Sequence, residues 1–145
     1  MRKSDKKQAI KKANVLIEER FLNSKSLITE AIMGKLEYDV LEAYLVAALW
    51  TNEEEIEGGN IHDFDPEAKE SANNDVLAFM KAAGELLQGM EPEQIGHDLW
   101  LTRNGHGAGF WDRGLGEKGE VLSNIARKMG GKDLYRGDDG KLYFS

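Results

Sequence analysis

The chain has 145 residues, a formal net charge of −7 and no cysteine. This length suits one domain that buries roughly two-thirds of its unfolded surface without help from a metal or a disulfide. The lack of cysteine excludes disulfides, thiolate catalysis, and zinc or iron–sulfur sites built on sulfur ligands. No apolar run reaches the length of a membrane span, and the basic N-terminus leads into an amphipathic pattern instead of a secretory signal, so we expect a soluble intracellular protein.

Acidic residues are concentrated in the middle of the chain. Residues 1–25 carry a net charge of +5, residues 26–100 carry −14, and residues 101–145 carry +2. Because nucleic-acid affinity comes largely from Lys and Arg contacts with phosphates, the acidic segment disfavours binding to duplex DNA. It favours a basic partner protein, and the alternative is a solvated face that only keeps the protein soluble.

The first part of the chain, residues 1–90, is predicted to hold about four helices. Residues 4–21 place apolar side chains on one helical face and lysines on the others, and a second helical pattern covers residues 27–32. A third segment, residues 38–50, is apolar on most sides, so we expect it at the centre of the helical part. Its inward positions would be Tyr38, Leu41, Leu45, Ala48 and Leu49.

A surface loop and a well-marked fourth helix follow. The charge run and the Gly-Gly pair within residues 51–64 are typical of a loop. Asp65, Pro66 and Glu67 then supply an N-cap, a proline at the first helical position and an acid in the first turn. We expect this helix to end near Gly89 and to turn inward Ala72, Val76, Met80, Ala83 and Leu87.

Residues 96–116, GHDLWLTRNGHGAGFWDRGLG, contain the Asn104-Gly105 pair that is typical of a β-hairpin turn. The hairpin loop would have two residues or four, and both registers divide the side chains into the same two faces. One face would hold His97, Leu99, Leu101, Arg103, Phe110 and Asp112, and the other would hold Asp98, Trp100, Thr102, Gly109, Trp111 and Arg113. The two-residue register pairs His97 with Asp112, and the four-residue register pairs Asp98 with Arg113.

Residues 117–145 complete the predicted fold. A helix begins at Glu117, stops at a Gly-Gly pair and turns inward Val121, Leu122, Ile125 and Met129. A second hairpin then turns at residues 138–140. We therefore expect an α+β fold in a single domain, residues 1–145, in which an antiparallel β-β-α-β-β unit within residues 96–145 packs with the helices of residues 1–90.

The stretch from Gly96 to Gly114, together with the later DLYRGDDGKLY, resembles an uncharacterised family of small proteins encoded by bacteriophages and related mobile elements. The family pattern reads GHDFWLTRNGHGAGFWDRG, then a helix, then LYxGDDG, and this chain departs from it at Leu99, where the pattern has phenylalanine. The resemblance implies a phage-encoded accessory protein in the cytoplasm of a bacterial host, acting on a host protein or a defence system. It does not imply a particular activity.

Polar and aromatic residues of the expected hairpin form the candidate site. Because a buried turn tip would leave backbone groups unpaired, we expect NGHG to be exposed, so that alanine variants of Arg103 and His106 remain folded. The candidate binding residues are Arg103, Asn104, His106, Arg113, Trp100 and Trp111. A nucleobase stacked on the two tryptophans is one interpretation of their shared face, and packing of that face into the core is the other.

Catalytic and ligand-binding chemistry has less support in these residues. His97 and Asp112 could act as a base and the group that orients it, but the motif offers no serine or cysteine nucleophile. A metal site of His97, His106 and Asp112 would need side chains from opposite ends of the hairpin. The glycines before the helix at 117 lack the spacing of phosphate-binding loops.

These observations predict a binding protein without catalytic activity, metal or cofactor. Its partner would be a basic host protein, contacted through the acidic surface and the hairpin. The alternative is a small enzyme or a nucleotide-binding module that uses the polar residues of the segment 97–113.

Overall fold

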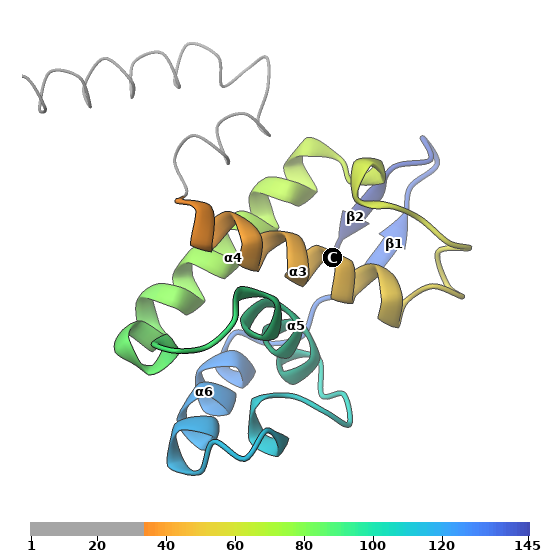
Figure 1. The fold of residues 1–145 in the computed structure, drawn as a ribbon. Coiled ribbons are helices and arrows are strands. Elements are labelled where there is room, and N and C mark those ends of the chain that lie inside the picture. The colour runs from red at the N-terminus through yellow and green to blue at the C-terminus, as the bar shows by residue number, and fades with distance from the viewer. Residues whose placement is uncertain (1–33) are drawn as a thin grey trace, which may run out of the picture.

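A computed structural model describes residues 34–145, which form an α+β fold (Figure 1). The α-helices are α3 (Lys35–Thr51), α4 (Pro66–Ala83), α5 (Pro92–Arg103) and α6 (Glu117–Lys128), and the strands are β1 (Leu134–Arg136) and β2 (Leu142–Phe144). Three short 3₁₀ helices lie in the connections, η1 (Ile61–Asp63), η2 (Gly84–Leu87) and η3 (Phe110–Asp112). The helices predicted within residues 4–21 and 27–32 lie outside the described residues.

Helix α3 lies at the centre of these elements, as its sequence predicts, and packs against both α4 and α5 (Figure 1). Leu41 and Leu45 are buried, and Leu49 is partly buried against the same core. Tyr38 differs from the prediction, because it lies in the first turn of the helix and is exposed. The apolar sides of the helix therefore face its neighbours only from Val40 onward.

Helix α4 begins where the sequence predicts. The Asp65 carboxylate accepts a hydrogen bond from the Glu67 amide at 2.9 Å, and Pro66 is the first helical residue. Ala72, Val76 and Ala83 are buried, as expected. The α-helix ends earlier than predicted because Gly84, with φ +52°, stops it, and η2 carries Leu87 into the core instead.

Helix α5 replaces the hairpin expected for residues 97–113, so that prediction is wrong. Asn104 and Gly105 end the helix instead of turning two strands: the Gly105 amide bonds the Thr102 carbonyl at 3.2 Å and the His106 amide bonds the Leu101 carbonyl at 3.0 Å. This pair of bonds is a Schellman cap, with Gly105 at φ +70°. A type I′ turn would need positive φ at Asn104 as well, and Asn104 has φ −98°.

The close packing of α5 on α3 depends on Gly96. A Cβ atom at this position would lie 2.7 Å from the Ala43 Cβ and 2.7 Å from the Tyr44 amide nitrogen. One turn further along, the Trp100 ring meets the Tyr44 ring edge to face, with centroids 5.3 Å apart. The residues of α5 are covered on nearly all sides, and the buried ones are Ile95, Gly96, Asp98, Leu99, Trp100, Leu101, Thr102 and Arg103.

The C-terminal elements follow the prediction more closely. Helix α6 buries Leu122 and partly buries Ile125, and Met129 at its C-cap is also partly buried, but Val121 is exposed because it lies on the outer side of the helix. Strands β1 and β2 form the predicted hairpin, in antiparallel register with Tyr135 opposite Tyr143. The sheet has only these two strands, so the expected β-β-α-β-β unit is reduced to its second hairpin.

Hydropathy of the helices bears on membrane association. Within residues 34–145, every helix is too short or too polar to cross a lipid bilayer.

Candidate functional site

Arg103 is buried, so its expected place at an exposed tip is wrong. Its guanidinium Nη1 donates to Asp75 Oδ2 at 2.7 Å and to the Tyr44 hydroxyl at 3.1 Å. Its Nε donates to the Gly130 carbonyl at 2.7 Å, and its Nη2 donates to the Met129 carbonyl at 3.1 Å. The side chain therefore joins α3, α4 and α5 to the turn that follows α6, and it is fully engaged inside the protein.

The side chains around Arg103 explain how its buried guanidinium is stabilised. Burial raises the pKa of the Tyr44 hydroxyl to about 12, although the Arg103 charge opposes this shift. Asp75 Oδ2 also forms an ion pair with Lys132 Nζ at 2.7 Å, so two cations share one carboxylate. A neutral tyrosine and a carboxylate with two partners hold a buried guanidinium in place.

Asp98 and Arg113 form the second internal ion pair of the 96–116 segment. Asp98 is fully buried, and its Oδ1 accepts from Arg113 Nη2 at 2.9 Å. The hydrogen bond from Arg113 to Asp98 raises the pKa of Arg113. One of the two hairpin registers left open by the sequence paired these residues across strands, and the contact occurs instead between a helix and the loop that follows it.

The other predicted pair, His97 with Asp112, is not brought together. The Asp112 carboxylate accepts from the Gly109 amide at 3.0 Å and caps η3. Asn104 is also used internally, since its amide group donates to the Trp100 carbonyl at 3.0 Å and accepts from the Lys132 backbone at 2.8 Å. These polar groups hold the loop shape and the helix end.

The two tryptophans of the segment do not share a stacking face. Trp100 is buried and donates from Nε1 to Thr51 Oγ1 at 2.8 Å, whereas 47% of Trp111 is exposed on η3. A nucleobase could therefore not stack on both rings at once. The core interpretation applies to Trp100 alone.

The hollow that the segment forms with the end of α3 involves another tryptophan. A pocket of about 420 Å³ lies between α3, α5 and the following loop, and its lining is Trp50, Thr51, Leu101, His106, Gly107 and Ala108. Trp50 is 67% exposed, the largest fraction among the exposed large hydrophobic side chains of residues 34–145. Of the predicted site residues, His106 alone lines this pocket.

A second hollow of about 410 Å³ continues along the same two helices. It is lined by Val46 and His97 together with Lys35, Asp39, Glu42, Ala43 and Glu93. Val46 lies one turn before Trp50 on α3, and His97 lies one turn before Leu101 on α5, so residues that border the two hollows are neighbours on one surface of this helix pair. We call this surface the Trp50 face and define it as Val46, Trp50, His97, Leu101, His106 and Ala108.

Sequence reasoning placed His97 and His106 in the candidate site but missed Val46 and Trp50. The helical pattern of residues 38–50 contained the signal, because Val46 and Trp50 follow the polar Glu42 at spacings of four residues. Apolar residues on the same helical face as a polar residue lie outside the buried stripe of the helix. They are therefore candidates for a surface contact.

The histidines and carboxylates of the described chain do not form a catalytic or metal-binding arrangement. In the part of the chain that the structure describes, neither His97 nor His106 hydrogen-bonds a carboxylate, and no three His, Asp or Glu side chains gather closely enough to hold a metal ion. No protein-family model, curated protein or solved structure matches this chain. The proposal for its function is therefore based on the geometry of the described residues.

Proposed function

We propose that the protein is a non-catalytic binding protein whose Trp50 face docks a basic segment of a partner protein. The observation that carries this proposal is an indole that is two-thirds exposed beside an apolar hollow. Tryptophan is enriched among the few residues that dominate binding energy at interfaces, especially where it lies at a well-packed pocket. Leaving such a ring in water costs the folded monomer the free energy that a partner would recover.

Charge around the Trp50 face supports a basic partner. Asp39, Glu42 and Glu93 line the hollow next to it, and Glu53, Glu54 and Glu55 are exposed directly after α3. The cation in that hollow, Lys35, is paired with Asp39 at 3.2 Å. Residues 34–145 as a whole carry 11 Lys and Arg against 22 Asp and Glu. Such a field attracts a basic surface and repels nucleic acid.

The alternative, a small enzyme or nucleotide-binding module, needs the polar side chains of the segment 97–113 to face a substrate. Other parts of the protein instead bind the side chains of Arg103, Asn104, Asp112 and Arg113.

On the resemblance of residues 96–114 to the phage-encoded family, the partner is a host protein and the site of action is the bacterial cytoplasm. Interference with a defence system fits this context.

The test measures binding of defined peptides to the full chain by fluorescence polarisation. Two amphipathic helical peptides share one apolar face of leucine and carry either lysines or glutamates on the other face. We expect the lysine peptide to bind, and we expect its affinity to fall as the salt concentration rises. Exposed charges are screened beyond about 8–10 Å at physiological ionic strength. Trp50→Ala should weaken binding about tenfold or more, as for an interface hot spot.

Trp111→Ala is the matched control, since Trp111 is exposed but lies outside the Trp50 face. It should bind the lysine peptide like the wild type. Equal binding of the two peptides would contradict the role of charge. Unchanged binding by a folded Trp50→Ala variant would show that the Trp50 face is not the site.

A further inference from the structure

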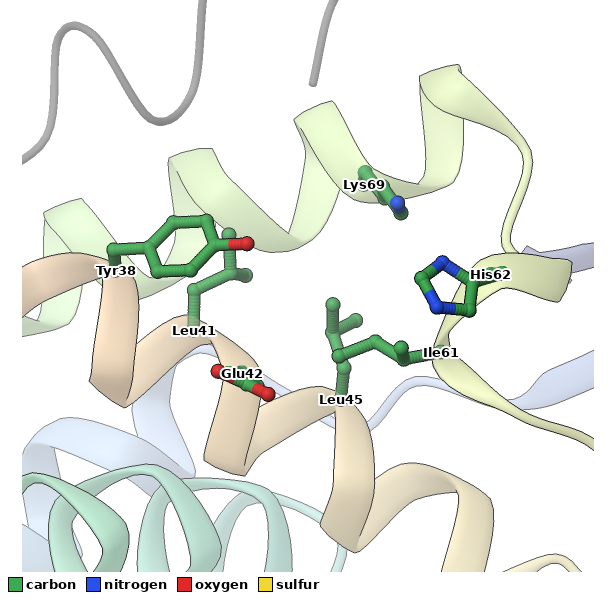
Figure 2. A pocket seen from close by; sticks show the side chains of 7 residues that line it. All are labelled: Tyr38, Leu41, Glu42, Leu45, Ile61, His62 and Lys69. Carbon is green, nitrogen blue, oxygen red and sulfur yellow. The ribbon is translucent and has the colours of Figure 1, made fainter. Parts of the chain in front are cut away.

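A separate hollow lies on the other side of α3, between α3, η1 and α4 (Figure 2). It has a volume of about 210 Å³, and its lining is Tyr38, Leu41, Glu42, Leu45, Ile61, His62 and Lys69. Leu41 and Leu45 are buried, and Ile61 is partly buried against the core. The hollow therefore has an apolar floor with four polar side chains around it.

The four polar side chains have no partner inside the described part of the chain. Within residues 34–145, Tyr38, Glu42, His62 and Lys69 make no side-chain hydrogen bond and no ion pair. Neighbouring charged groups are engaged, by contrast: Asp65 caps α4 and pairs with Lys141 at 3.9 Å. An ammonium and a carboxylate that border the same hollow without pairing leave both charges available to a ligand.

The segment that carries His62 is held firmly in position. The Asn60 side chain accepts from the His62 amide at 2.8 Å, and the Asp63 carboxylate accepts from the Asn60 amide at 3.0 Å, which together form a capping box. The next residues are tied to the sheet, since the Asp65 amide donates to the Leu142 carbonyl at 3.0 Å. A ligand would therefore meet a largely preformed wall, which lowers the entropic cost of binding.

Figure 2 shows that the polar side chains come from different sides of the hollow. The imidazole of His62 and the ammonium of Lys69 come from η1 and α4, whereas the carboxylate of Glu42 comes from α3, and the Tyr38 hydroxyl is directed toward the space between them. One side can thus donate hydrogen bonds to an anion, and the opposite side can accept them from a cation.

We propose that this hollow binds a free α-amino acid with an aliphatic side chain. Lys69 and His62 hold the carboxylate of the amino acid, Glu42 holds its ammonium group, and the side chain rests on Leu41, Leu45 and Ile61. The volume favours a ligand of this size, because it is smaller than the roughly 300–1,000 Å³ of sites for drug-sized molecules. This hollow shares only Glu42 with the hollow next to the Trp50 face, whereas Lys69 and His62 belong to this hollow alone.

The experiment titrates L-leucine into the full chain and follows backbone amide signals by NMR. We expect saturable shifts at residues of α3, η1 and α4 that line the hollow. Lys69→Met should weaken binding about tenfold or more, since a hydrogen bond to a charged group is lost. Lys81→Met, at an exposed position of the same helix, is the matched control and should bind like the wild type.

Two analogues test the assignment of the charged groups. The wild type should bind 4-methylpentanoate and isoamylamine, which lack the ammonium and the carboxylate respectively, more weakly than leucine. Glu42→Gln should lower the affinity for leucine about tenfold while leaving the affinity for 4-methylpentanoate unchanged. Absence of leucine binding, or equal affinity for leucine and 4-methylpentanoate, would overturn the proposal.

Discussion

Arg103 has a structural role that follows from its partners. It is the charged group through which three helices and the turn after α6 meet, and its side chain is 3% exposed. A buried cation is tolerated only when its donors are satisfied and a counter-charge is close. Asp75, Tyr44 and two backbone carbonyls meet these conditions.

Replacement of Arg103 should therefore cost stability. We expect Arg103→Ala to lower the free energy of unfolding by about 3 kcal/mol. This value is at the lower end of the range for a broken buried ion pair, because Asp75 still pairs with Lys132. Urea denaturation measures this difference. His106→Ala, in the loop that follows α5, is the control and should change stability by less than about 0.5 kcal/mol. Equal stability of the two variants would contradict the role given to Arg103.

Tyr44 makes the same region sensitive to alkaline pH. Folding raises the pKa of its hydroxyl from 10.0 to about 12, so between these values the folded protein keeps a proton that the unfolded chain has released. Stability is thus fully present below pH 10 and falls as the pH rises toward 12.

The wild type should lose about 2–3 kcal/mol more than Tyr44→Phe across this pH interval. At neutral pH the variant should be less stable by about 1 kcal/mol, because the Arg103 hydrogen bond is missing. Chemical denaturation of both proteins at several pH values measures the difference. Parallel stability profiles would show that Tyr44 ionises normally in the folded state.

At the scale of elements, the contact between α3 and α5 depends on a missing side chain. Gly96 lets the backbones approach so closely that Ala43 and Tyr44 occupy the space of a Cβ atom. The aromatic contact of Trp100 with Tyr44 follows from this approach. The two hollows of the Trp50 face lie along the same helix pair.

Gly96→Ala should destabilise the protein by about 1–3 kcal/mol through overpacking, although alanine favours a helix by about 1 kcal/mol. Asn74→Ala on the exposed side of α4 is the control, and it should be neutral or slightly stabilising. Thermal unfolding followed by circular dichroism compares the two. A higher Tm for Gly96→Ala would mean that α3 and α5 separate at little cost.

At the scale of the whole molecule, α3 connects the two halves of the core. Its buried residues meet α4 on one side and α5 on the other, so they belong to one apolar cluster that also includes Leu122 of α6 and Leu142 of β2. A charge introduced on the buried side of this helix would therefore disturb the packing of both α4 and α5.

Leu45→Asp should abolish folding, since it places an unpaired carboxylate at a position that is 2% exposed. Val46→Asp is the matched control one residue later, where 42% of the side chain is exposed, and this variant should fold. Circular dichroism and thermal melting distinguish the two. A native-like melt for Leu45→Asp would place this side of α3 at the surface.

The sequence by itself determined the elements whose signals are local. The cap and proline at Asp65 and Pro66, the periodicity of α3 and α6, and the turn between β1 and β2 all depend on neighbouring residues. Such signals act within one or two turns of chain. They predicted the type of these elements and, for α4 and α6, the first residue.

Only the tertiary structure decided the state of residues 96–116 and the position of the candidate site. Helix α5 is covered on nearly all sides, so it has no amphipathic period, and its polar residues are satisfied by partners far along the chain, such as Tyr44 for Arg103. Asn104-Gly105 fits a hairpin turn and a helix cap equally well, because both need a glycine with positive φ. The choice between them depends on the packing of α5 against α3, and the same packing brings Trp50 beside His106.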